Sequence, residues 1–208
     1  MRIGLFGGSF NPIHNGHITL AENIKKELSL DKVILIPSGE APHKSSAEYA
    51  DAKHRLSMCR LAIEGTEGFE VSSFETDRSG RSYSIYTVKY FRELYPNDEL
   101  FLIVGSDMLM CFDKWYRFEE ILSLTAVAAA TRNGDDIEQL KKIAQKLQKY
   151  GKIIVVNNSP VIVSSTKIRK MIKNNEDTYC YLREKVVKYI RMNDLYPNDS
   201  EDEPERKK

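Results

Sequence analysis

The chain has 208 residues, of which 41% are hydrophobic and 29% are charged, and its formal net charge is +1. This length suits a single globular domain with a sizeable core. Lysine and arginine number 31 against 30 aspartates and glutamates. Because nucleic-acid-binding domains usually carry a basic excess, this balance argues against a nucleic-acid partner and favours small-molecule substrates.

No secretory signal layout opens the chain, and no apolar run reaches the roughly 18 residues of a membrane span. We therefore expect a cytoplasmic protein without a membrane partner, and the sequence leaves open whether it forms a homo-oligomer. Cys59, Cys111 and Cys180 are odd in number and widely spaced. This spacing predicts reduced thiols rather than a disulfide framework or a zinc site.

The first strand is expected at residues 2–6, where an apolar run ends at Gly7 and Gly8. A helix is predicted to begin at Asn15 or Gly16, with apolar residues every three or four positions. Glycines allow a ligand to approach the backbone, and the free amides and dipole of a helix N-terminus favour phosphate. This strand, turn and helix therefore predict an anion site.

Two histidines, His14 and His17, lie at the mouth of that helix. Imidazoles beside an anion site point to phosphate chemistry, but the same pair could be two metal ligands or two ordinary surface histidines. The stretch matches neither the Walker A motif nor the dinucleotide fingerprint. The residues alone leave these alternatives open.

Further strands alternate with helical patterns along the chain. This order predicts an α/β, Rossmann-like, doubly wound parallel sheet with a small helical C-terminus, formed by residues 1–195. Residues 196–208, which are strongly polar from Pro197 onward, are expected to be a disordered tail. Further strands are expected at 32–36, 69–72, 100–104, 125–130 and 152–156. Helices are expected at 50–64, 108–112, 135–149 and 178–193, and two more are expected to begin after a Ser82 cap and after Ser164.

The stretch from Gly7 to His17, Gly-Gly-Ser-Phe-Asn-Pro-Ile-His-Asn-Gly-His, resembles the signature of the nucleotidyltransferase superfamily that carries a His-x-Gly-His motif. Within that superfamily the chain is most similar to bacterial nicotinate mononucleotide adenylyltransferases. Membership implies transfer of AMP from ATP to nicotinate mononucleotide, giving nicotinate adenine dinucleotide and pyrophosphate in NAD biosynthesis. It also implies Mg2+ as the cofactor, held by phosphates and not by protein side chains.

Three more stretches carry the resemblance. Pro42-His43-Lys44 follows the second strand, and although a solvated loop lysine is the simpler interpretation, the resemblance implies that Lys44 contacts phosphate. Ser82-Tyr83-Ser84 resembles a Ser-Tyr-Thr motif whose backbone recognises the carboxylate of the pyridine ring. The segment from Gly105 through Asp107 to Trp115 resembles a nucleotide-binding turn followed by the tryptophan that stacks on that ring. The simpler interpretation of Ser106 and Asp107 is a helix cap.

The last motif, Val163-Ser-Ser-Thr-Lys-Ile-Arg169, resembles the superfamily signature that binds the triphosphate. Ser164, Ser165 and Thr166 could simply cap a helix. Capping does not explain Lys167 and Arg169, because the helix dipole disfavours cations in a first turn. An anion at this site would explain them.

The resemblance thus implies a set of site residues. The catalytic residues are His14, His17, Lys44 and Arg169; the ATP-binding residues are Gly7, Gly8, Ser9, Phe10, His17, Gly105, Asp107, Ser164, Ser165, Thr166 and Arg169; and the mononucleotide-binding residues are Lys44, Ser84, Trp115, Tyr116 and Arg132. Three alternatives remain: a pantetheine-phosphate adenylyltransferase, a cytidylyltransferase, or a nucleotide sensor without turnover. Class I aminoacyl-tRNA synthetases share the paired histidines, but this chain is too short for one.

Overall fold

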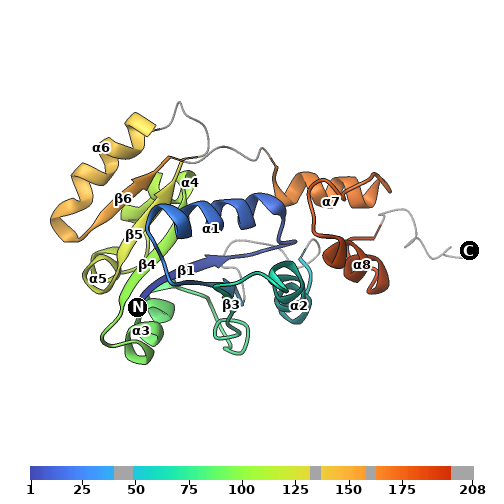
Figure 1. The fold of residues 1–208 in the computed structure, drawn as a ribbon, viewed down its shortest axis with the longest axis horizontal. Coiled ribbons are helices and arrows are strands. Elements are labelled where there is room, and N and C mark those ends of the chain that lie inside the picture. Colours follow the sequence, from blue (N-terminus) through green and yellow to red (C-terminus); the bar gives the residue numbers. More distant parts are fainter. Residues whose placement is uncertain (40–48, 132–136, 158–162, 198–208) are drawn as a thin grey trace, which may run out of the picture.

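A computed structural model describes residues 1–39, 49–131, 137–157 and 163–197 (Figure 1). Six parallel strands form one sheet in the order β3-β2-β1-β4-β5-β6, which confirms the predicted Rossmann-like fold. The strands are β1 (Arg2–Gly8), β2 (Lys32–Pro37), β3 (Phe69–Val71), β4 (Glu99–Gly105), β5 (Ala126–Ala130) and β6 (Ile153–Val156).

Helices cover both faces of the sheet, and each face has its own hydrophobic core. One face packs against α1 (Asn15–Glu27), α2 (Ala52–Ile63), α7 (Ser165–Lys173) and α8 (Glu184–Met192). The other packs against α3 (Ser84–Leu94), α4 (Ser106–Met110), α5 (Phe118–Leu124) and α6 (Ile137–Leu147), with the short 3-10 helices η2 (Phe112–Lys114) and η4 (Gln148–Tyr150).

The strands are apolar on both sides because both sheet faces are covered. Successive strand residues point to opposite faces, so Leu5 belongs to the α3 side and Phe6 to the α1 side. This explains why the strands appear in the sequence as continuous apolar runs rather than as alternating patterns.

The strand order reverses between β1 and β4, which are neighbours in the sheet. In doubly wound sheets, ligands bind in the crevice outside the carboxyl ends of the strands at this switch point. Figure 1 shows α7 and α8 beside the end of β1 and the start of α1, so the C-terminal helices border this crevice. No helix in the described ranges is long and apolar enough to cross a membrane.

The structure corrects several predicted boundaries. Gly7 and Gly8 continue β1 instead of ending it, because both pair with β2. Ser82 does not cap α3: Tyr83 is the cap residue, and the Ser82 hydroxyl accepts a hydrogen bond from the backbone of Gly39.

The C-terminal boundaries also differ from the prediction. The last helix begins at Glu184 and not at residue 178, because the preceding turn directs the Tyr181 carbonyl to the backbone N–H of Asn15. Tyr196, predicted to start a disordered tail, is 8% exposed, and its hydroxyl donates to Asn11 Oδ1 at 2.7 Å. The folded domain therefore includes Tyr196, and residues 198–208 lie outside the described part of the chain.

Candidate active site

The histidine loop, residues 9–14, joins β1 to α1 at the switch point. Phe10 has a φ of 44°, in the left-handed region, and the Asn11–Pro12 peptide bond is cis. A Cβ at Gly8 would lie 2.9 Å from the Phe10 ring, so the packing of that ring requires glycine there, whereas a Cβ at Gly7 would meet open space. Since Phe10 is 1% exposed, the loop is anchored in the core by its own aromatic side chain.

His14 and His17 form a stacked pair at the start of α1, with ring centroids 3.7 Å apart. The backbone N–H of His14 donates to Nδ1 of His17 at 3.2 Å, so a neutral His17 carries its proton on Nε2. Burial, and then the neighbouring His14, lower the pKa of His17 well below its ordinary value of 6.5. His17 is therefore a neutral hydrogen-bond donor near pH 7, through Nε2.

The second motif, Ser164 to Arg169, packs directly on the histidine loop. The Ser165 hydroxyl donates to the Pro12 carbonyl at 3.0 Å, and Arg169 Nη1 donates to the Asn11 carbonyl at 2.9 Å. Ser164 caps α7 by accepting a hydrogen bond from the backbone three residues later. Capping thus explains Ser164, while Ser165 and Arg169 join the two motifs.

The first turn of α7 keeps its positive charge near the crevice. Thr166 is exposed, and its Oγ1 lies 3.5 Å from Nη2 of Arg169. The Lys167 ammonium lies 5.3 Å from the centre of the Tyr181 ring. An anion at the N-terminus of α7 would meet both these cations and the helix dipole.

The turn after β4 lies at the same edge of the sheet. Gly105 is the N-cap residue of α4, and no side chain in the described part of the chain forms a capping hydrogen bond there. Ser106 and Asp107 lie inside the helix, so the interpretation of either as its cap is wrong. Ser106 is buried and Asp107 is exposed in the first turn of α4. A carboxylate at the carboxyl end of β4 can accept hydrogen bonds from a nucleotide hydroxyl or amine.

An aromatic pocket of about 310 Å³ opens between the start of α3 and the segment from η2 to α5. It brings together three residues that the resemblance assigned to the mononucleotide: Ser84, Trp115 and Tyr116. The Tyr116 ring lies 5.0 Å from that of Tyr83. The complete lining is Ser82, Tyr83, Ser84, Met108, Lys114, Trp115, Tyr116 and Ile121.

The electrostatics of the aromatic pocket favour an anion. The N-terminus of α3 opens onto it, and among the described residues no side chain caps that helix and none in its first turn is acidic. Lys114 lines the pocket and has no ion pair with a described carboxylate. Its neighbours do have such pairs: Arg117 lies 2.6 Å from Glu120.

Sequence reasoning missed Lys114 and two buried charged residues beneath the site, Arg55 and Glu75. Lys114 has a local signal, because it directly precedes Trp115. Arg55 has a weaker one: it precedes Cys59 by four residues and Ala62 by seven, which places it on the buried face of α2.

Two predicted phosphate contacts cannot be placed. Lys44 lies in the segment 40–48 and Arg132 in the segment 132–136, both outside the described residues.

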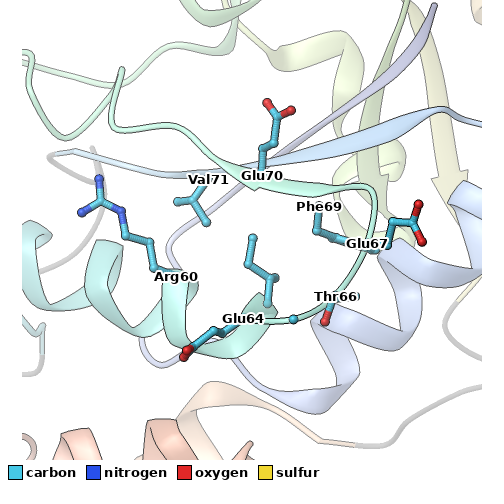
Figure 2. Close-up of a pocket in the computed structure, with 9 residues that line it drawn as sticks. Arg60, Glu64, Thr66, Glu67, Phe69, Glu70 and Val71 are labelled. Atoms are coloured by element: carbon cyan, nitrogen blue, oxygen red, sulfur yellow. The ribbon is translucent and has the colours of Figure 1, made fainter.

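A separate hollow of about 660 Å³ lies between the end of α2 and β3, at the edge of the sheet. Figure 2 shows its charged side chains, among them Arg60, Glu64 and Glu67, pointing apart rather than toward a common centre. Glu70 is already paired with Lys32 at 2.9 Å. None of the site residues predicted from the sequence lines this hollow.

Within the described ranges, no three histidine, cysteine, aspartate or glutamate side chains come together as a metal site. Among the described residues, the polar groups around the crevice are the imidazoles of His14 and His17, hydroxyls, the cations of Lys167 and Arg169, and the Asp107 carboxylate. Since Mg2+ prefers carboxylate and phosphate oxygens, this set suits an ion that arrives on a phosphate chain.

Comparisons with known proteins agree with this geometry. A family model described as cytidylyltransferase-like matches residues 5–171. A protein of Thermoanaerobacter sp. (strain X514) named probable nicotinate-nucleotide adenylyltransferase is 38% identical over 204 residues, 97% of each chain. The nicotinate-nucleotide adenylyltransferase of Bacillus subtilis (strain 168) is 35% identical, over 94% of this chain and 98% of its own.

Among solved structures, nicotinic acid mononucleotide adenylyltransferase of Plasmodium falciparum, complexed with NaAD, has the same fold. It superposes with a TM-score of 0.76 at 21% identity, covering 94% of this chain and 97% of its own. The resemblance noted in the sequence is thereby confirmed across nearly the whole chain. The chain belongs to the nicotinate-nucleotide adenylyltransferase family of cytidylyltransferase-like proteins.

Proposed function

We propose that this protein transfers AMP from ATP to nicotinate mononucleotide and releases pyrophosphate. One observation carries the proposal. The same fold places two features near the carboxyl ends of its strands: a stacked histidine pair at a helix N-terminus, and an aromatic pocket with an end that favours an anion. The first suits a phosphate chain and the second suits a flat, negatively charged ring. Family membership, at 35 to 38% identity over nearly the full chain, supports the same assignment.

The reaction needs alignment more than it needs a base. The attacking group is a 5′-phosphate that is already ionised, so catalysis depends on positioning and on neutralising charge around the α-phosphorus. Neutral His17 would donate through Nε2 to an α-phosphate oxygen, with His14 beside it. Donors fixed before the reaction stabilise developing charge without reorganising.

The triphosphate would lie along the histidine loop and the first turn of α7. Arg169 and Ser165 already contact the loop backbone, so the two motifs would present their donors to the triphosphate from a fixed relative position. Gly105 and Asp107 would lie along the adenosine. The proposed phosphate contacts of Lys44 and Arg132 rest on the family resemblance alone.

The aromatic pocket would hold the nicotinate ring. Trp115 and Tyr116 provide flat apolar surface, and the N-terminus of α3 provides N–H groups for the carboxylate. Both features distinguish this acceptor from phosphopantetheine, which has no ring.

His17, Ser165 and Arg169 would bind and orient the triphosphate, and through its oxygens they would hold Mg2+. When bound, Mg2+ would supply neutralisation of phosphate charge.

Pyrophosphate release from ATP and Mg2+ tests the proposal, with nicotinate mononucleotide, nicotinamide mononucleotide and phosphopantetheine compared as acceptors. We expect fast release with the nicotinate compound and slow release with its amide. Quenching of the single tryptophan by nicotinate mononucleotide should saturate over the same concentration range. Faster release with phosphopantetheine, or ATP binding without turnover of any acceptor, would contradict the proposal.

A further inference from the structure

Arg55 is a buried charge that none of the recognised motifs includes. It lies on α2 and is 2% exposed, which is rare for arginine. Among the described residues it forms no ion pair, and burial lowers the pKa of its guanidinium group. Burying a charge is unfavourable unless hydrogen bonds replace its water, so its hydrogen-bond partners indicate what it does.

The guanidinium group of Arg55 donates to backbone carbonyls in three separate segments. Nη1 donates to Ser9 in the histidine loop at 2.9 Å. Nη2 donates to Gly39 after β2 at 3.0 Å, and Nε donates to Ala50 before α2 at 3.0 Å. The planar guanidinium group directs its donors from three nitrogens in fixed directions, whereas the three N–H groups of an ammonium share one nitrogen on a flexible stem.

Gly39 extends this network toward the aromatic pocket. Its backbone N–H donates to the Ser82 hydroxyl at 3.0 Å, and Ser82 lines that pocket. Ser82 in turn hydrogen-bonds the buried carboxyl of Glu75, which also accepts from the Thr87 hydroxyl. A Cβ at Gly39 would lie 2.3 Å from the Glu75 carbonyl oxygen, so only glycine fits where these two backbone segments approach each other.

We propose that Arg55 is a positioning residue for adenylyl transfer, holding the histidine loop and the Ser82 side of the aromatic pocket in fixed register. This inference rests on the proposed function, because it assigns one reactant to each side. In-line attack requires the acceptor phosphate and the α-phosphorus to be aligned, and a misplacement of about 1 Å can lower the rate about 10²-fold.

The test replaces Arg55 with methionine, which keeps much of the volume but removes all five donors. We expect R55M to lower kcat/KM for nicotinate mononucleotide about 10²-fold, mainly through kcat. R55K should retain intermediate activity, because one ammonium replaces only some of these donors. Since S82A breaks the same connection, the double variant R55M/S82A should lose less than the product of the two single losses.

Arg92 provides the matched control. It also donates to several backbone carbonyls, including those of Leu124 and Asp98, both at 2.8 Å. These two carbonyls directly precede β5 and β4, so Arg92 lies at the amino ends of the strands, away from the site. R92M should lower the thermal unfolding temperature yet keep kcat/KM within about twofold.

The two possible failures are distinguishable. A wild-type protein that does not use nicotinate mononucleotide would overturn the proposed function and, with it, this inference. A wild-type protein that does use it, beside a folded R55M with no greater activity loss than R92M, would overturn the positioning role alone. If R55M does not fold, R55K decides: kcat equal to that of the wild type overturns the role, and a selective loss of kcat supports it.

Discussion

The two sides of the site differ in how firmly they are held. In the histidine loop, Phe10 and Asn11 are each 1% exposed and His14 is 7% exposed. In the aromatic pocket, Tyr116 is 51% exposed and Met108 is 45% exposed. The side that would carry out chemistry on phosphate is built into the core, and the side that would recognise a ring is built on the surface.

The reason for this difference lies in what each task requires. Hydrogen bonds to a developing charge must be fixed before the reaction, and the loop is fixed by Ser165, Arg169 and Tyr196, all distant in sequence. Ring stacking and attraction between charges tolerate small shifts, so open side chains are sufficient. Substitutions on the two sides should therefore affect different kinetic constants.

The largest loss of activity should come from a change in the histidine loop and the start of α1, here called the fixed side; the aromatic pocket is called the open side. His17→Ala removes a preorganised donor, so we expect kcat to fall about 10²- to 10³-fold with little change in KM for nicotinate mononucleotide. Steady-state pyrophosphate release measures both constants. His54→Ala is the matched control. His54 lies on α2, and its Nδ1 is 3.0 Å from the Tyr189 hydroxyl on α8, so its removal should cost stability and not activity. A loss below about threefold for His17→Ala would remove His17 from the mechanism.

On the open side, Trp115→Ala should act on KM instead. Loss of ring stacking costs about 1–3 kcal/mol in comparable base–aromatic contacts, so we expect KM for nicotinate mononucleotide to rise about tenfold at nearly constant kcat. Trp115→Phe keeps an aromatic face and should show a smaller rise. If Trp115→Ala lowered kcat and left KM unchanged, the contrast between the two sides would be wrong.

The sequence predicted the parts of this protein whose cause is local. Apolar runs indicated most of the strands, and the residues from Gly7 to His17 and from Ser164 to Arg169 indicated the two segments that pack together at the start of α1 and α7. The first helix was predicted to begin at Asn15 or Gly16, just before the periodic apolar positions from Ile18 onward, and it begins at Asn15.

Long-range contacts were not predictable in the same way. Ser82 was predicted to cap the nearby helix, but its hydroxyl pairs with Gly39, 43 residues away. Tyr196 was assigned to a polar tail, but its hydroxyl donates to Asn11, 185 residues away. A serine before a helix and a tyrosine near a polar end both have simpler local interpretations, so only the folded arrangement shows their partners.

A smaller effect should separate charge from stacking on the open side. Lys114→Met removes an exposed cation, and exposed ion pairs contribute about 0.2–1 kcal/mol. We expect the preference for nicotinate over nicotinamide mononucleotide to fall about threefold, with less effect at high salt. The ratio of kcat/KM for the two acceptors measures it.

Lys146→Met is the matched control for that change, since Lys146 is exposed but pairs with Asp113 at 3.6 Å. An equal loss with both acceptors would place the effect of Lys114 on the shared phosphate rather than on the carboxylate. That result would leave the N-terminus of α3 as the source of the discrimination.

The smallest expected change is in the protonation of His17 near pH 6.5. An ordinary imidazole is about half protonated at pH 6.5. Burial and the neighbouring His14 lower the pKa of His17, so its protonated fraction at pH 6.5 should be well below one half in the free protein. NMR of the imidazole nitrogens measures both this fraction and the Nε2–H tautomer, and the spectrum of His17→Gln identifies the signals.

The same shift fixes the sign of a stability effect. Because the folded-state pKa of His17 is below the unfolded value, the unfolded chain binds more protons as the pH falls below about 6.5. The contribution of His17 to the free energy of unfolding is therefore fully present above that pH and is lost as the pH falls toward the folded-state pKa. His17→Gln should reduce this loss, measured as the difference in thermal unfolding temperature between pH 7.5 and pH 5.5. An unchanged dependence on pH would mean that His17 titrates normally, and the fixed side would then be less rigid than its contacts indicate.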